Sequence, residues 1–340
     1  MQPVRVVRER GGLEESEHLV RVAVWRRGAV TCAGGDPGAL VYLRSSAKPV
    51  QALACVLSGA ADRFGYGGRE LALACASHNG EPFHVATAAE MLRRAGLAPD
   101  ALQCGAHPPV HEPSARALIR AGEAPTALHN NCSGKHAAML AACVASGWSL
   151  GDYLEPAHPL QRLNRENVAR TAGVTPEQVH IAIDGCSAPV FAVPLGAAAR
   201  LVATVADPAG GGLAGELRAA AERLGAAVRA APEMLGGTGR SDTDVIRATG
   251  GRVLCKVGAE GVWCLGVAER GLGVTVKCLD GSAQAARHVG LELLRACGVL
   301  DDAAWEALLP HRDTVVRNHR GLDTGRVRVE LPDALVAAAA

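Results

Sequence analysis

Strand-forming segments stand at both ends of this chain, and helix-forming segments fill the stretch between them. Residues 19–24 and 28–32 alternate apolar and polar side chains around a short turn, which predicts a β-hairpin. Residues 253–257, 262–268 and 273–279 are three β-type runs separated by glycine-containing turns, which predicts an antiparallel meander. No long linker divides the chain, so we expect the strands of its two ends to pair in one antiparallel sheet. This is an α+β (α/β sandwich) layout with an inserted helical lobe.

The middle of the chain carries the side-chain spacing of helices. The layout predicts one unit over residues 1–340, with a sheet lobe from about 15–45 and 250–330 and a helical lobe from about 46–249. Residues 232–242 are rich in glycine and predict a connecting loop. Predicted helices cover residues 48–58, 82–95, 114–121, 136–146, 158–172, 214–224 and 283–297.

Composition excludes several classes of protein. Lys and Arg number 35 and Asp and Glu number 34, for a net charge of +1, so no basic surplus points to nucleic acid or to an anionic membrane. No apolar stretch is long enough to cross a bilayer, and the charged start of the sequence does not resemble a signal peptide. Eleven cysteines, an odd number without a CxxC pair, predict reduced thiols in a cytoplasmic protein.

Lysine is rare in this chain, and its positions are informative. The 35 basic residues include four lysines, and the others are arginines. A lysine can lose its proton when it is desolvated, or donate a lone pair to a metal, whereas an arginine stays charged. Three of the four lie in short segments rich in Ser, Cys, His and Gly; the lysines are Lys48, Lys135, Lys256 and Lys277.

The segment RSSAKPVQ (44–51) contains an S-x-x-K string. If Ser45 opens a helix, the i,i+3 spacing places its hydroxyl and the Lys48 amine on one face, and a neutral Lys48 can then act as general base. The alternative is a helix-capping serine beside a solvated lysine. Ser46 is the competing hydroxyl, but its i,i+2 spacing turns it away from Lys48.

Two further segments concentrate reactive side chains. In CASHNGE (75–81), Ser77 is either a second catalytic hydroxyl, with Lys256 as its partner, or the cap of the next helix beside a surface His78. In NNCSGKH (130–136), three interpretations stay open. Cys132 is a nucleophile near His136, or the segment ligates a metal together with a distant cysteine, or its glycine turn binds an anion.

Taken in order, six segments resemble the rhizobial-type (class 3) L-asparaginases, also called asparaginase II. The resemblance covers roughly residues 15 to 330, and it implies a fold like that of the serine β-lactamases, penicillin-binding proteins and glutaminases. It also implies hydrolysis of L-asparagine to L-aspartate and ammonia by a homodimer. The segments are RSSAKPVQ, CASHNGE, NNCSGKH, IDGCSAPVF, LGGTGRSDT and KVGAEG.

The resemblance further implies a site with two Ser-Lys pairs next to a zinc ion. A serine attacks the side-chain amide, ammonia leaves, and water hydrolyses the acyl-enzyme. Ser45 is the favoured nucleophile, although the two serines could exchange roles, and zinc is not the expected source of the attacking water. The pairs fall on Ser45 with Lys48 and Ser77 with Lys256, the zinc ligands on Cys132, Lys135 and Cys186, and the expected substrate-binding residues on Arg44, His136 and Asp184.

Two other functions remain compatible with these residues. One is a related serine acyl hydrolase that acts on glutamine or a lactam. The other is a catalytically silent zinc-binding protein of the same fold, which would be expected to lack a serine or lysine of the pairs, whereas all four are present.

Overall fold

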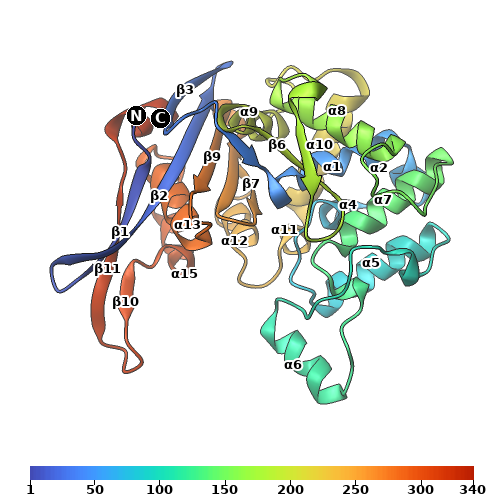
Figure 1. The fold of residues 1–340 in the computed structure, drawn as a ribbon, viewed down its shortest axis with the longest axis horizontal. Coiled ribbons are helices and arrows are strands. Elements are labelled where there is room, and N and C mark those ends of the chain that lie inside the picture. The colour runs from blue at the N-terminus through green and yellow to red at the C-terminus, as the bar shows by residue number, and fades with distance from the viewer.

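The computed structural model describes residues 1–340. A large antiparallel sheet forms one side of the molecule and a group of helices forms the other, with the two chain ends close together beside the sheet (Figure 1). The strands are β1 (Val4–Arg10), β2 (Leu13–Arg26), β3 (Ala29–Gly34), β4 (Leu40–Tyr42), β5 (His180–Ile183), β6 (Pro189–Pro194), β7 (Val253–Gly258), β8 (Val262–Val267), β9 (Leu272–Cys278), β10 (Val315–Arg317) and β11 (Asp323–Glu330).

Most helices lie between β4 and β7, as the sequence predicts. Short 3-10 turns are η1 (Arg44–Ala47), η2 (Pro99–Ala101), η3 (Ala127–His129), η4 (Pro176–Gln178) and η5 (Ala268–Arg270). The α-helices are α1 (Lys48–Gln51), α2 (Leu53–Leu57), α3 (Ala60–Arg63), α4 (Gly68–Ala74), α5 (Pro82–Arg94), α6 (Glu112–Ala121), α7 (Ser133–Ser146), α8 (Pro159–Ala172), α9 (Leu195–Ala206), α10 (Gly215–Ala230), α11 (Pro232–Leu235), α12 (Ser241–Ala248), α13 (Ala283–Ala296), α14 (Asp302–Ala307), α15 (Leu309–Arg312) and α16 (Asp333–Ala339).

Strands from both ends of the chain share the large sheet, which confirms the predicted α+β layout. Its order is β10-β11-β1-β2-β9-β8-β7, with β3 also paired to β2. The register of β2 against β9 places Val22 opposite Val276, and both side chains are fully buried. The predicted hairpin and the C-terminal meander correspond to β2–β3 and β7–β8–β9.

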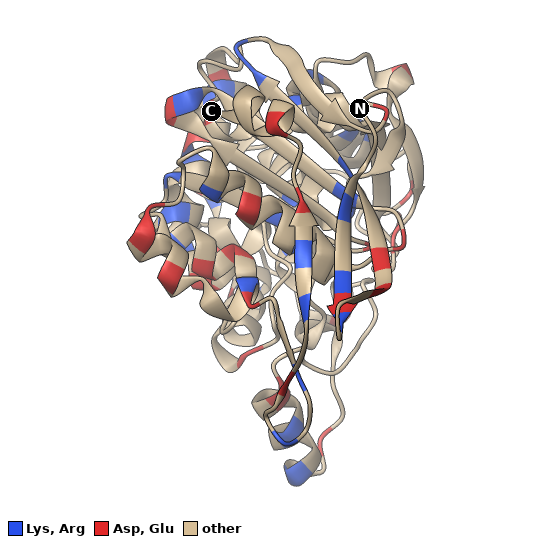
Figure 2. Cartoon of the chain, turned by 90° about the vertical axis from the view of Figure 1, so that its left-hand side faces the viewer, with Lys and Arg blue, Asp and Glu red and all other residues tan.

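The sheet contains three strands that the sequence pattern does not predict: β1, β10 and β11. These strands carry many charges. Basic and acidic residues both occur along these strands (Figure 2). Arg5 pairs with Glu14 and Glu17, and Arg328 pairs with Glu9. Such cross-strand charge pairs stabilise an exposed face only modestly, but they hide the apolar alternation by which strands are recognised.

Helices cover both faces of the central strands. On one face, α9 approaches β9 so closely that a Cβ at Gly273 would lie 2.0 Å from the Ala199 carbonyl oxygen. On the other face, Gly290 of α13 packs against the ring of Trp263, a side chain that is fully buried. The glycines therefore set how near the helices lie to the sheet.

The helical lobe is not purely helical. It holds a three-stranded sheet of order β4-β6-β5, and the predicted loop at residues 232–242 contains α11 and the start of α12. Pro232 and the glycines of this segment are typical of a loop, so the sequence did not predict α11. Proline is nevertheless well suited to the first turn of a helix. None of the helices is long and apolar enough to span a membrane.

Candidate active site

The first site segment lies on η1 and α1, where β4 ends. Arg44 adopts a left-handed backbone, with φ of 49°, which is uncommon for a residue other than glycine. The next residue, Ser45, is partly exposed, and its hydroxyl makes no hydrogen bond within the protein. The Ser46 hydroxyl is buried and donates to the Lys256 carbonyl oxygen at 2.7 Å. The turn therefore exposes Ser45 and holds Ser46 against β7.

The second segment follows α4 and runs between two other loops. The Ser77 N–H donates to the Leu235 carbonyl oxygen, and the His78 N–H to that of Asn131. His78 is completely buried, with its Nε2 atom 2.9 Å from the Ser133 hydroxyl, so the interpretation of His78 as a surface side chain was wrong. Glu81, not Ser77, occupies the cap position of α5. This backbone pairing fixes the Ser77 side chain in the interior.

Lys48 points at Ser77. The Nζ amine of Lys48 donates a hydrogen bond of 2.8 Å to the Ser77 hydroxyl, and the two residues are only 1% and 4% exposed. Both side chains are thus removed from bulk water. The predicted pairing was Ser45 with Lys48 and Ser77 with Lys256. The structure instead joins one member of each pair.

Lys256, on β7, contacts a carboxylate that the sequence analysis did not single out. Its Nζ atom lies 3.3 Å from Oδ2 of Asp242 and 2.9 Å from the Val257 carbonyl oxygen. Burial and the positive charge of Lys48 lower the pKa of Lys256 to about 8, although Asp242 opposes the shift. Lys256 is therefore poised to change its protonation state near neutral pH.

Asp242 is completely surrounded by donors. Its carboxylate accepts hydrogen bonds from the Val257 N–H at 2.9 Å and from Nε1 of Trp263 at 3.0 Å, besides the contact with Lys256. An acid in the first turn of a helix is common for purely electrostatic reasons, so the sequence of α12 gave no special signal. The structure shows that this acid positions the Lys256 amine.

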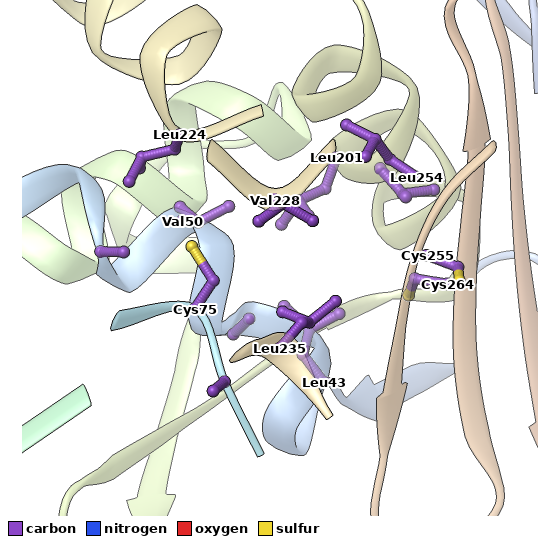
Figure 3. Packing of buried hydrophobic residues seen from close by; sticks show 14 of the residues in the cluster. Leu43, Val50, Cys75, Leu201, Leu224, Val228, Leu235, Leu254, Cys255 and Cys264 are labelled. Carbon is purple, nitrogen blue, oxygen red and sulfur yellow. The ribbon is translucent and has the colours of Figure 1, made fainter. Parts of the chain in front are cut away.

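A small apolar cavity of about 40 Å³ lies behind these groups, with Ser46 and Lys256 in its lining. Figure 3 shows Leu235, Val228 and Leu254 directed towards one another around this space, with Cys75 beside them. Such a lining excludes water from one side of Lys256. The low dielectric environment accounts for the dominant effect of burial on the Lys256 pKa.

The Cys132, Lys135 and Cys186 side chains meet in a second cluster. Cys132 caps α7, Lys135 lies in its first turn, and Cys186 comes from the turn between β5 and β6. Lys135 Nζ donates to the Cys186 sulfur at 3.1 Å, and the contact between the two thiol groups lowers the pKa of Cys132 well below its ordinary value. All three residues are buried.

The donor atoms of this cluster fit a thiophilic metal ion such as zinc. Two sulfurs and one amine nitrogen are soft or borderline ligands. The adjacent His136 is fully buried and gives one ring nitrogen to the Tyr153 hydroxyl at 2.7 Å, whereas its Nε2 atom has no partner. A buried polar atom without a partner points to a group that the protein alone does not supply.

Arg44 and Asp184 form an ion pair beside this cluster. The Nε and Nη2 atoms of Arg44 each lie 2.9 Å from Oδ1 of Asp184. Cys186 lies two residues after Asp184, and Ser45 directly follows Arg44. The ion pair therefore connects the turn of the sulfur cluster to the turn that presents Ser45.

A glycine-rich loop closes against CASHNGE. The Glu81 carboxylate accepts hydrogen bonds of 2.8 Å from the N–H and the hydroxyl of Thr238, and Arg240 donates to Asn79 at 3.0 Å. Gly237, at φ of 111°, leaves no room for a side chain, because a Cβ would lie 2.3 Å from the Glu81 carboxylate. The sequence predicts only a connecting loop here, and the structure shows that the loop holds the second segment in place.

Comparison with known proteins agrees with this assembly of segments. A search of curated proteins gave no match. The family model described as L-asparaginase II matches residues 6–329 of the 340 in the chain. This range includes every segment that meets in the two clusters. We conclude that the chain belongs to the L-asparaginase II family.

Proposed function

We propose that the protein hydrolyses L-asparagine to L-aspartate and ammonia through a serine acyl-enzyme. The family supports amidohydrolase activity of the L-asparaginase type in general. The observation that carries the mechanism is the buried hydrogen bond from Lys48 to Ser77. It places an amine and a hydroxyl, the elements of a serine nucleophile system, in a site with little water.

Ser45 is the proposed nucleophile. It is more exposed than Ser77, and it lies three residues before Lys48, so a substrate can reach its hydroxyl while Lys48 is close. Lys48, in its neutral form, takes the Ser45 proton, with the Ser77 hydroxyl as relay. The Ser45 Oγ–carbon bond forms, the amide C–N bond breaks, and ammonia leaves with a proton. Water then attacks the ester and releases aspartate.

Lys256 and Asp242 set the charge around Lys48. A protonated Lys256 places a second positive charge near Lys48, and Asp242 holds that charge in position. At the end of β7, Gly258 packs against the turn before Ser45, since a Cβ there would lie 2.7 Å from the Leu43 carbonyl oxygen.

Cys132, Lys135 and Cys186 are the proposed zinc ligands. When bound, zinc would supply a fixed positive charge near Arg44 that attracts a substrate carboxylate. Arg44 and His136 are the proposed substrate contacts, with Asp184 holding the Arg44 side chain. None of the bond-breaking steps requires a metal-activated water.

We also propose a cytoplasmic homodimer with a fold like that of the serine β-lactamases. Eleven free thiols suit a reducing compartment. Leu40 and Tyr42 on β4 are 51% and 46% exposed and lie on the same face of the small sheet. This exposed apolar pair is the proposed contact with a second copy. Light scattering of the wild type and of Tyr42→Asp tests the dimer.

The decisive experiment measures ammonia release by the purified protein from L-asparagine and L-glutamine. Release from asparagine at more than ten times the rate from glutamine supports the proposal. Preference for glutamine supports the alternative glutaminase-type acyl hydrolase. Absence of turnover on both amides in folded protein contradicts the proposal and favours a silent zinc-binding protein.

A further inference from the structure

Three side chains with metal-binding atoms converge where β2 faces the end of β9, outside both clusters described above. His18 Nδ1 lies 2.6 Å from Oδ2 of Asp280, and Cys278 Sγ lies 3.0 Å from Oδ1 of Asp280. The three donor atoms lie within 4.8 Å of one another. The sheet register produces this convergence, because Val20 pairs with Cys278 and the next residues along each strand bring His18 opposite Asp280.

A second observation at the same place concerns His288 of α13. His18 and His288 line one small cleft of about 10 Å³ between the sheet and α13. His288 is only 2% exposed, and its Nδ1 atom has no hydrogen-bond partner. An unpaired buried nitrogen is unfavourable unless a water or another polar group satisfies it. The cleft therefore places an unpaired buried nitrogen, which a polar group such as a water would satisfy, on the side of His18.

We propose that His18, Cys278 and Asp280 bind one divalent transition-metal ion, with a water in the cleft as the remaining ligand. An imidazole nitrogen, a thiolate and a carboxylate form a mixed donor set that suits zinc or cobalt and disfavours magnesium and calcium, which prefer oxygen ligands alone. Without metal, Asp280 accepts hydrogen bonds from the groups that would otherwise be ligands. Binding displaces the Cys278 thiol proton to solvent, so the affinity rises with pH.

The expected consequence of this ion is mechanical. Asp280 also accepts a hydrogen bond of 3.0 Å from the Ser282 N–H, and Ser282 caps α13. An ion held between His18 and Asp280 therefore ties β2 to the start of α13. Because it binds the folded chain, it raises the melting temperature with increasing metal concentration.

The test is a Co²⁺ titration of full-length protein that carries Cys132→Ser and Cys186→Ser, so that the other thiol pair is absent. A thiolate-to-cobalt charge-transfer band should saturate at about one equivalent. His18→Ala in this background should weaken binding by about 10-fold or more, and Cys278→Ser should abolish the band. The matched control is His319→Ala, at an exposed histidine, which should leave the titration unchanged. Absence of the band, or a band that survives Cys278→Ser, overturns the proposal.

Because Cys278 is fully buried, a second variant keeps the test independent of folding. Asp280→Asn retains an oxygen for the Ser282 N–H but removes the negative charge. Zinc should raise the melting temperature of the parent with the two serine substitutions, and Asp280→Asn should lose most of that increase. Equal stabilisation of parent, His18→Ala and Asp280→Asn by zinc would rule out this site.

Discussion

The Nζ atom of Lys48 lies 2.8 Å from the hydroxyl oxygen of Ser77, which joins the start of α1 to the loop that follows α4. Lys256, the predicted partner of Ser77, contacts Asp242 instead. The basic groups therefore have distinct surroundings: Lys48 has a hydroxyl as its partner, and Lys256 has a carboxylate. This difference gives each lysine a separate role that substitutions can test.

The different surroundings of Ser45, Ser46 and Ser77 predict a graded response to alanine. Ser45→Ala should lower kcat on the order of 10³-fold or more, because it removes the proposed nucleophile. Ser77→Ala should also lose most turnover, since Lys48 then has no hydroxyl partner. Ser46→Ala is the matched control, because its hydroxyl is occupied by the Lys256 carbonyl oxygen, and it should retain activity within about 10-fold. Steady-state ammonia release measures all three.

The order of the two serines can be resolved by trapping. Acid quenching during turnover, followed by mass spectrometry of the peptides, should find the aspartyl ester on Ser45. An ester on Ser77 in the wild type would reverse the two roles. An adduct on Cys132 would establish a thiol mechanism.

The rarity of lysine made a large part of this site predictable. Lys48, Lys135 and Lys256 were singled out because an arginine-rich chain kept lysine there, and all three are buried in the two clusters. The pairing could not be predicted, because it depends on how β7 meets α12. Asp242 carries no sequence signal of its own, since acids are frequent in the first turn of any helix.

The outer strands show a different limit of sequence reasoning. β1 and β11 pair along residues 5–9 and 326–330, but charged residues interrupt their apolar alternation. Their pairing with each other joins residues that lie more than three hundred positions apart in the chain. A local pattern cannot supply that information.

The pKa of Lys256 predicts the pH dependence of the reaction. Burial lowers this pKa to about 8, so the neutral amine accumulates as pH rises through 8, and a profile of kcat/KM against pH should show an inflection there. Asp242 raises the pKa, hence Asp242→Asn should move the inflection to lower pH. An unchanged inflection in that variant would show that another group titrates.

The lowered pKa of Lys256 also makes the free energy of unfolding depend on pH. The folded-state pKa of Lys256 lies below the ordinary lysine value of 10.5. Between these two pH values the unfolded chain binds more protons, so the free energy of unfolding gains a favourable contribution as pH rises from about 8 to 10.5. Lys256→Met should remove this contribution in urea unfolding at several pH values.

Loss of the Cys132, Lys135 and Cys186 cluster should weaken substrate binding more than it slows the chemical steps. Cys132→Ala should reduce the bound zinc and raise KM about 10-fold or more, while kcat changes only a few-fold, because the serines and Lys48 remain in place. Metal analysis and steady-state kinetics on the same preparation provide the check. Cys143→Ala, at a buried cysteine outside both clusters, is the control for cavity formation. A large fall in kcat with unchanged KM would mean that the metal takes part in the chemistry.

The contact between α9 and β9 predicts a strong stability effect from a single methyl group. At Gly273 a new Cβ would lie 2.0 Å from the Ala199 carbonyl oxygen and 2.9 Å from the Ala203 nitrogen. These are backbone atoms of a buried helix, so the helix must shift as a unit. Gly273→Ala should therefore lower the free energy of unfolding by about 1–3 kcal/mol or more.

Gly68→Ala is the matched substitution, because it also adds one methyl group but meets no atom within 4 Å at the start of α4. It should be neutral or stabilise by about 0.4–1 kcal/mol, since alanine restricts the unfolded chain. Urea unfolding of both variants, with activity measured on the same samples, separates the two effects. If Gly273→Ala unfolds at the same urea concentration as Gly68→Ala, the close approach of α9 to the sheet does not exist in solution. The position of β7 would then need another explanation, because α9 packs on β9, and β9 is joined to β7 through β8.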